Sequence, residues 1–236
     1  MRIIVLGDVH GNVGALRAAL EAAERVGCDR IFHTGDLVGY GPNPNETVDL
    51  VRARRIEGVK GNFDESAAWD GDSPAAAGDA ARQLLAARAL RWTVRNLGFL
   101  QRNYLKDLPF SLERRVGPRK VSVFHASPID LYEPIDPDSP ESTLEALAGV
   151  TGAELHLFGH THRPFHRVAD GRHFINAGSV GKPEDGDPRA CLAVVHLDGG
   201  VRVEFQRIPY DVERTARETE SAGLPRELAT AIRTGN

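Results

Sequence analysis

The chain is poor in cysteine, with only Cys28 and Cys191 among its 236 residues. Two cysteines cannot form the several crosslinks that hold a small secreted scaffold together, so the pattern favours a reducing compartment. The sequence also lacks an apolar run long enough to cross a membrane, and a strand-like segment begins at residue 3 with no leader pattern before it. We therefore expect a cytoplasmic protein that does not enter membranes.

Positive charge is not in excess either, since 29 basic residues face 33 acidic ones and the net charge is −4. A protein with this balance has no broad electrostatic footprint for nucleic acid, so we expect no stable nucleic-acid binding. We interpret the short basic runs at 52–55 and 114–115 as solvated faces. We find no internal repeat or low-complexity tract, and the length allows a full core, so we predict a single domain over residues 1–236.

The first part of the chain alternates strand-like and helix-like segments. The apolar runs at 3–6, 30–33 and 56–60 predict strands, and the 3.6-residue periodicity at 12–26 and 46–54 predicts helices. Such an alternation is typical of right-handed crossovers between parallel strands. We therefore expect an α/β fold that begins with a parallel sheet.

Residues 66–109 interrupt this alternation and carry no strand pattern. Leu85, Ala89 and Trp92 share one helical face, and Tyr104 lies on another, so we predict a helical insertion that caps the strand ends. Trp92 and Tyr104 could stack on a ring of a ligand, but aromatic residues at helical spacing more often pack in a core. We favour packing for both.

The second half of the chain reads mainly as strands. We predict the pair 111–116 and 120–124, a helix at 142–148, a strand at 154–158 and two hairpins, 165–168 with 172–175 and 190–197 with 201–208. Asp211 is placed to cap a helix that Gly223 ends, and Pro225 opens a last helix.

Potential metal ligands follow five of the predicted strands. Residues two apart in extended chain point to the same side, so the side chains of Asp8 and His10 can bind one ion. The complete set contains nitrogen and oxygen but no sulfur, which suits borderline-hard cations such as Mn²⁺, Fe²⁺ or Zn²⁺. Seven ligands are too many for one ion and suit two, with Asp36 between them. The seven are Asp8, His10, Asp36, Asn62, His125, His160 and His162.

Each of these residues also has a simpler interpretation when taken alone. Asp36 lies in a loop dense in turn residues, and Asn12 is a plausible helix cap that could also face a ligand. We interpret His33, His156 and His196, which lie within strand patterns, as satisfied core or surface residues. The joint occurrence of the motifs at strand ends is what favours a metal site.

The motifs Asp8-Val9-His10-Gly11, Gly35-Asp36, Gly61-Asn62-Phe63-Asp64, His125 and Gly159-His160-Thr161-His162, with the loop 176–179, resemble the calcineurin-like metallophosphoesterase signature. The stretch 37–44 and the helical insertion resemble its bacterial and archaeal branch of phosphodiesterases and diadenosine-tetraphosphatase relatives. The resemblance implies a four-layer αββα sandwich of two mixed β-sheets with helices outside, carrying a helical cap over 66–109.

The resemblance also implies roles for the ligands. Asp8, His10 and His162 would hold one divalent ion, Asn62, His125 and His160 the other, and Asp36 would bridge them. A hydroxide between the ions, positioned by Asp36 with Asn62 at the reacting centre, would attack phosphorus in line. Mn²⁺ is the favoured ion, with Fe²⁺, Zn²⁺, Ni²⁺ and Mg²⁺ as alternatives, and the partner would be a small phosphorylated, nucleotide-like substrate.

One position departs from the common pattern, because Phe63 stands where many members have a histidine that contacts phosphate. Asn12 and Phe63 remain our candidates for substrate contact. We predict a phosphodiesterase, with a phosphatase acting on nucleotides, dinucleoside polyphosphates or phosphoproteins as the alternative. A protein-binding scaffold is the alternative of another class, since the retromer subunit that resembles this fold also lacks that histidine. The complete ligand set favours an enzyme.

Overall fold

The computed structural model describes residues 1–71 and 79–236. Its first sheet has the strand order β10-β9-β1-β2-β3, in which β1 runs parallel to β2 and antiparallel to β9. The parallel pairing of β1, β2 and β3 confirms the sheet expected from the alternating segments. The strands are β1 (Arg2–Leu6), β2 (Arg30–His33), β3 (Glu57–Gly58), β9 (Ala190–His196) and β10 (Arg202–Ile208).

The second sheet is also mixed, with the order β4-β5-β6-β8-β7. Its central strands β5, β6 and β8 are parallel, while β4 and β7 pair antiparallel at the two edges. Its strands are β4 (Ser111–Val116), β5 (Arg119–Phe124), β6 (Leu155–Phe158), β7 (Phe165–Ala169) and β8 (Arg172–Asn176).

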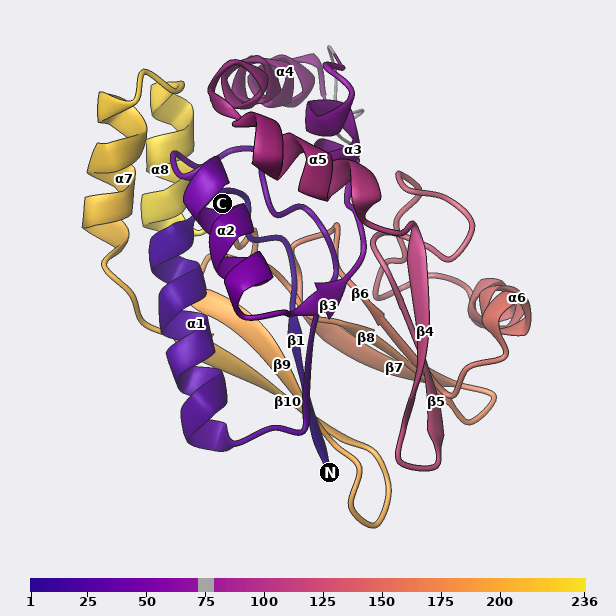
Figure 1. Ribbon diagram of the computed structural model, residues 1–236. Helices are drawn as coiled ribbons and strands as arrows, with labels where there is room; N and C mark the ends of the chain where they lie inside the picture. The colour runs from indigo at the N-terminus through magenta and orange to yellow at the C-terminus, as the bar shows by residue number, and fades with distance from the viewer. Residues whose placement is uncertain (72–78) are drawn as a thin grey trace.

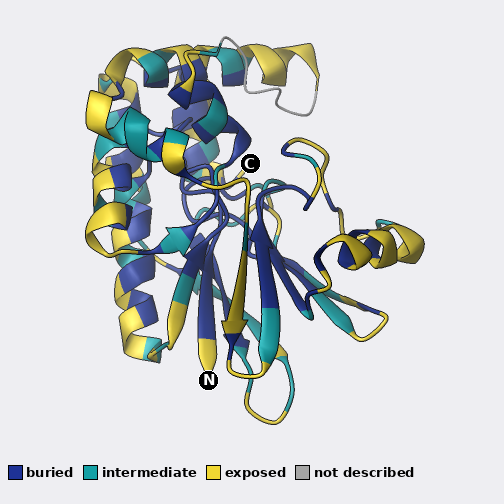
Figure 2. Cartoon of the chain, turned by 45° about the vertical axis from the view of Figure 1, so that its right-hand side comes forward, coloured by how far each residue is buried: buried dark blue, intermediate teal, exposed yellow. Residues whose placement is uncertain are grey.

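The two sheets pack face to face because successive side chains of a strand point to opposite sides. Ile3 and Val5 of β1 belong to the apolar cluster between the sheets, with Val121 and Leu157 of the second sheet. Ile4 and Leu6 point the other way, into the cluster that the helices cover. The central strands are therefore buried on both faces, as their dark colour in Figure 2 shows.

Helices cover both outer faces and complete the four-layer arrangement, with α6 the only described helix on the side of the second sheet (Figure 1). Those on the other side include α1, whose Leu16 and Leu20 pack on the first sheet. The helices are α1 (Val13–Val26), α2 (Pro44–Ala53), α3 (Asn62–Ala68), α4 (Ala80–Asn96), α5 (Phe99–Asp107), α6 (Glu141–Thr151), α7 (Val212–Ser221) and α8 (Arg226–Thr234). None of the described helices has both the length and the apolar character needed to cross a membrane.

Two local predictions need correction. The strand expected over 56–60 is confined to β3, because Lys60 N–H donates to the Pro109 carbonyl rather than to a neighbouring strand. The helical region expected from residue 66 begins earlier, at Asn62, where Gly61 is the N-cap and the Asp64 carboxylate accepts from Gly61 N–H. The segment 72–78 of the predicted insertion lies outside the described residues.

Within residues 66–109, the remaining described segments are helical or connect helices, and α4 and α5 meet at Gly98, which caps α5. Trp92 packs against the main cluster and its indole N–H donates to the Ala222 carbonyl. Tyr104 packs there as well, with the Arg52 guanidinium 5.7 Å from its ring centre. The packing roles expected for both aromatic residues are confirmed, while the definition of this region as an inserted cap stays a prediction.

Candidate active site

The loops after β1, β2, β5 and β6 bring most of the predicted ligands to one edge of the sandwich, and Asn62 joins them from the first position of α3. Ligand sites in open α/β sheets lie beyond the carboxyl ends of strands, which is where these loops meet. Asp8, His10, Asp36, Asn62, His125 and His162 are buried, and His160 is partly buried.

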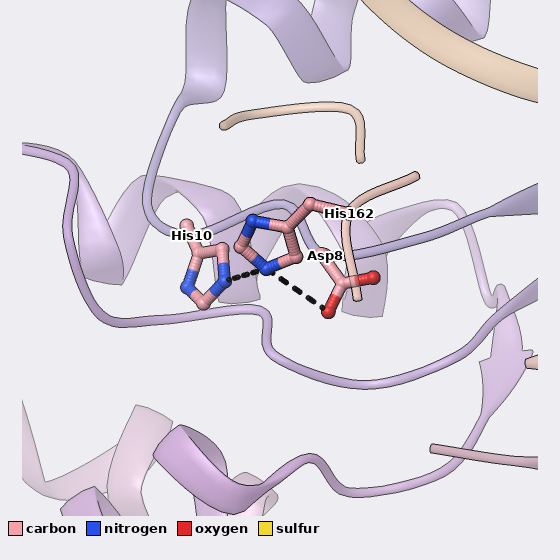
Figure 3. A group of neighbouring side chains, drawn as sticks. All are labelled: Asp8, His10 and His162. Carbon is pink, nitrogen blue, oxygen red and sulfur yellow. Dashed lines mark hydrogen bonds and ion pairs between the residues drawn. The ribbon is translucent and has the colours of Figure 1, made fainter. Parts of the chain in front are cut away.

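One group contains Asp8, His10 and His162, drawn in Figure 3. The two histidines face each other, with 3.0 Å between His10 Nε2 and His162 Nε2. The same His162 nitrogen lies 3.6 Å from Asp8 Oδ1. The three side chains therefore offer two nitrogens and one oxygen to a common point.

A second group contains Asn62, His125 and His160. Here His125 Nε2 lies 2.8 Å from Asn62 Oδ1 and 3.0 Å from His160 Nδ1. Asp36 lies between the two groups, since its Oδ2 is 3.5 Å from His10 Nε2 and 3.7 Å from His125 Nε2. The structure thus brings together all seven residues that the sequence singled out as ligands.

Each histidine is held by its other ring nitrogen. A backbone carbonyl only accepts, so the nitrogen facing it must carry the proton and the opposite nitrogen must present a lone pair. The anchoring contacts are His10 Nδ1 to Val38 O at 3.1 Å, His125 Nδ1 to Thr34 O at 2.8 Å, His160 Nε2 to Tyr132 O at 3.0 Å, and His162 Nδ1 to Glu184 Oε1 at 3.2 Å.

This anchoring aims the lone pairs of His125 Nε2 and His160 Nδ1 at each other across 3.0 Å, an arrangement that a cation between the two nitrogens would relieve. Between His162 Nε2 and His10 Nε2 the proton of His162 can do the same in the absence of metal, because Asp8 and Glu184 raise the pKa of His162 to about 9. A second partner on the far ring nitrogen is also how proteins orient metal-bound histidines. The donor set of imidazole, carboxylate and amide oxygen, without sulfur, therefore fits divalent metal ions.

The backbone at the site is strained. Asp8, His10, Asp36, His160 and His162 have φ between 44° and 71°, a region that residues other than glycine rarely adopt. Such conformations cost on the order of 1 kcal/mol each and persist where the surroundings enforce them. Hydrogen bonds enforce them here, including His10 N–H to the Asp36 carbonyl at 2.8 Å and His160 N–H to Asp8 Oδ2 at 3.0 Å.

We expect chelation to lower the melting temperature of the protein and Mn²⁺ to restore it. Buried carboxylates and strained ligand loops lose their compensating cation when the metal is removed, and an ion bound only by the folded state stabilises it by about 2.7 kcal/mol at a hundredfold excess over Kd. Calorimetric melting with EDTA and with added Mn²⁺ measures the shift. Superimposable melting curves in the two conditions would contradict a metal site formed by the folded chain.

The buried carboxylates and histidines of the site shift one another's pKa values. Burial raises the pKa of Asp36 well above its ordinary value, and the neighbouring Asp8 raises it further. Burial also raises the pKa of Asp64 to about 7, with Asp36 adding to the effect. At His162 burial opposes the proton, but Asp8 and Glu184 outweigh it and raise the pKa to about 9.

A pH dependence of metal affinity follows from His162, because metal must displace its proton. With a folded pKa of about 9 against an ordinary 6.5, this proton stabilises the metal-free fold fully below pH 6.5, and the contribution is lost as pH rises through 9. We therefore expect the Kd for Mn²⁺ to fall by up to about tenfold per unit between pH 7 and 8.5. Calorimetric titrations test this, and an affinity independent of pH over that range would disprove it.

A cavity of about 50 Å³ opens over the ligands. Predicted residues Asp36, Asn62, Phe63, His160 and His162 line it, together with three residues that the sequence reasoning missed: Tyr40, Arg82 and Glu184. No spacing rule points to these three, because they come from three separate segments. Of the three, Glu184 was the easiest to predict from the sequence, because an acidic residue shortly after the 176–179 loop can orient a histidine ligand.

Other candidates have different roles in the structure. Asn12 caps α1 as predicted, with Oδ1 accepting from Ala15 N–H, while its amide donates to the Gly181 carbonyl and the Tyr210 hydroxyl. These contacts occupy the side chain, so its expected contact with substrate gains no support. His33 is not the satisfied residue we expected, since its buried ring has no hydrogen-bond partner among the described residues. Burial lowers its pKa to about 3, which keeps the ring neutral.

Known proteins resemble this chain in both structure and sequence. A metallophosphoesterase from Sphaerobacter thermophilus has a similar structure, with a TM-score of 0.80 and 31% identity over 100% of this chain and 99% of that one. An uncharacterized protein, MJ0912, of Methanocaldococcus jannaschii is 29% identical over 98% of this chain and 96% of its own length. A symmetrical bis(5'-nucleosyl)-tetraphosphatase of Psychromonas ingrahamii is 43% identical over 54 residues, which are 22% of this chain and 20% of that protein.

Residues 1–200 match the model of the calcineurin-like phosphoesterase superfamily domain. The match covers every candidate ligand, and the similar metallophosphoesterase structure extends over the whole chain. The two mixed sheets with flanking helices agree with that assignment. The chain is therefore a phosphoesterase that belongs to the calcineurin-like phosphoesterase superfamily.

Proposed function

We propose that the chain hydrolyses phosphate esters, most favourably phosphodiesters, with two divalent ions held in the buried ligand cluster. The observation that carries this proposal is the pair of facing histidine contacts, each 3.0 Å long, with Asp36 Oδ2 between them at 3.5 and 3.7 Å. Two ions of this kind activate a water and neutralise charge on the phosphoryl oxygens. We favour Mn²⁺ because the donors are nitrogen and oxygen, and Fe²⁺, Zn²⁺, Ni²⁺ and Mg²⁺ remain alternatives.

The side chains of the site have two further roles, which are to bind the ions and to orient the ligands. His10 and His162 would hold one ion with Asp8, and His125, His160 and Asn62 would hold the other. The contacts of their far ring nitrogens fix the imidazole rings in place. Asp36 is oriented by Phe63 N–H, which donates to its Oδ1 at 2.9 Å and leaves Oδ2 to face both groups. This arrangement supports the bridging role that we propose for Asp36.

Phe63 supports the preference for esters with stable leaving groups. Its buried ring contacts His10 and Tyr40, at 5.2 and 4.6 Å between ring centres, and lines the cavity without offering a proton. Hydrolysis of phosphoanhydrides needs no such proton, so a dinucleoside polyphosphate is the alternative substrate. The short match with the symmetrical bis(5'-nucleosyl)-tetraphosphatase favours that alternative. We also propose a cytoplasmic location, because both cysteines are free thiols.

The proposal is tested with purified protein, EDTA or Mn²⁺, and bis-p-nitrophenyl phosphate. We expect turnover with Mn²⁺ and none with EDTA. A parallel screen of cyclic nucleotides, dinucleoside polyphosphates, phosphopeptides and monoesters then ranks the substrate classes. A protein that binds Mn²⁺ yet hydrolyses none of these would favour the interaction scaffold instead.

A further inference from the structure

The guanidinium of Arg82 lines the 50 Å³ cavity and comes from α4, within the predicted helical cap. Arg82 lies in the first turn of α4, where Asp79 caps the helix by accepting from Arg82 N–H at 2.9 Å. Among the described side chains that line the 50 Å³ cavity, Arg82 is the only cationic one apart from the histidines. Nothing in the ligand motifs accounts for a guanidinium at this place.

Arg82 also lines a second, wider cavity of about 320 Å³. The two cavities share Arg82, His160 and Glu184, so Arg82 borders both of them. The narrow cavity lies over the ligands Asp36 and Asn62 and suits the phosphate, while the wide cavity offers room for the rest of a substrate. In a substrate bound this way, the bond that breaks would join these two parts, and Arg82 would lie beside the leaving oxygen.

Glu184 holds the guanidinium between the two cavities. Its carboxylate accepts from Arg82 and from the buried Lys182, and it also faces His162 Nδ1 at 3.2 Å. The Arg82 side chain nevertheless stays 50% exposed, whereas Glu184 is 10% exposed. One carboxylate shared among three partners cannot neutralise Arg82 fully, so its remaining N–H groups are available to an anion in the cavity.

We propose that Arg82 is a catalytic residue that contacts the phosphate and stabilises the charge developing on the leaving oxygen. The proposal rests on the phosphoester hydrolysis proposed above. As hydroxide forms its bond to phosphorus, the ester P–O bond breaks and its electron pair goes to the leaving oxygen, which solvent then protonates. A guanidinium keeps its own protons and acts by charge and hydrogen bonding. It therefore complements Phe63, which leaves the site without a proton donor at that position.

Kinetics of metal-loaded Arg82→Gln on aryl phosphodiesters of graded leaving-group pKa provide the test. Loss of one aimed donor costs about 10²–10³ in kcat at buried sites, and water around the half-exposed Arg82 reduces this to about 10-fold. We expect the loss in kcat to grow as the leaving group becomes poorer. Arg82→Lys, which keeps the charge, should recover part of the rate. Arg91→Gln, an exposed arginine on α4 that lines neither cavity, serves as the matched control and should behave as the parent.

A binding measurement distinguishes failure of this inference from failure of the proposed function. Titration of inorganic phosphate into the Mn²⁺-loaded proteins should give a several-fold weaker Kd for Arg82→Gln than for Arg91→Gln. A parent protein that binds phosphate through Arg82 but hydrolyses no ester would overturn the proposed function and the catalytic role, while retaining the phosphate contact. An active parent whose kcat is unchanged in Arg82→Gln, or lowered equally for all leaving groups, would overturn the inference alone.

Discussion

Asp36→Asn is expected to lower kcat for Mn²⁺-dependent hydrolysis of bis-p-nitrophenyl phosphate by more than about 100-fold, because loss of residues that merely orient metal ligands already costs 10–100-fold. Asp36 Oδ2 lies between the two histidine pairs, so its replacement removes the negative charge common to both groups. The asparagine oxygen can still accept from Phe63 N–H, the contact that Asp36 Oδ1 makes at 2.9 Å. The fold should therefore survive the change.

Melting measurements separate loss of the site from loss of the fold. In EDTA, Asp36→Asn should melt at or above the temperature of the parent, because it removes a buried carboxylate that the charges of Asp8 and Asp64 oppose. With Mn²⁺ it should gain less stability than the parent. Asp107→Asn, an exposed aspartate at the end of α5, is the matched control and should keep full activity. Retention of parental kcat by Asp36→Asn would rule out the bridging role.

The ligand cluster was predictable because its residues follow apolar strands at short, fixed spacings. Asp8 and His10 come directly after β1, and His160 and His162 after β6, so the periodicity that locates the strands also locates the ligands. The carboxyl ends of neighbouring parallel strands meet at one edge of a sheet, which makes their convergence a consequence of topology. The same reasoning correctly separated Trp92, which packs, from the candidate ligands.

Residues from the surrounding loops were not predictable in this way. Arg82 and Glu184 are 102 positions apart, and their ion pair depends on where α4 lies relative to the loop before β9. No local periodicity encodes that relation. For Asn12, the position beside the motif suggested a ligand contact, which stays a prediction. The contacts of its amide with the Gly181 carbonyl and the Tyr210 hydroxyl, far along the chain, could not be read from the motif. His33 shows that a strand pattern predicts burial without predicting hydrogen-bond partners.

Substitution of Phe63 is expected to change how steeply kcat/KM depends on the pKa of the leaving group, which is the second large effect. The parent is expected to show a steep fall in kcat/KM as leaving-group pKa rises across aryl phosphodiesters, because no side chain at position 63 can protonate the departing oxygen. Arg82 lessens the developing charge but transfers no proton. General acid catalysis is worth about 10²–10⁴-fold, so Phe63→His should raise kcat/KM for the poorest leaving group by up to about 10².

The position of the ring makes this substitution informative. Phe63 lines the cavity next to Asn62, and its backbone contact with Asp36 does not depend on the side chain. Phe63→Leu is the control, since it removes the ring contact with His10 without adding an acid and should keep the steep slope of the parent. A flatter slope in Phe63→His alone would show that proton donation at this position had been restored. A shallow slope in the parent would instead mean that another group already supplies the proton, and the account of Phe63 would then be wrong.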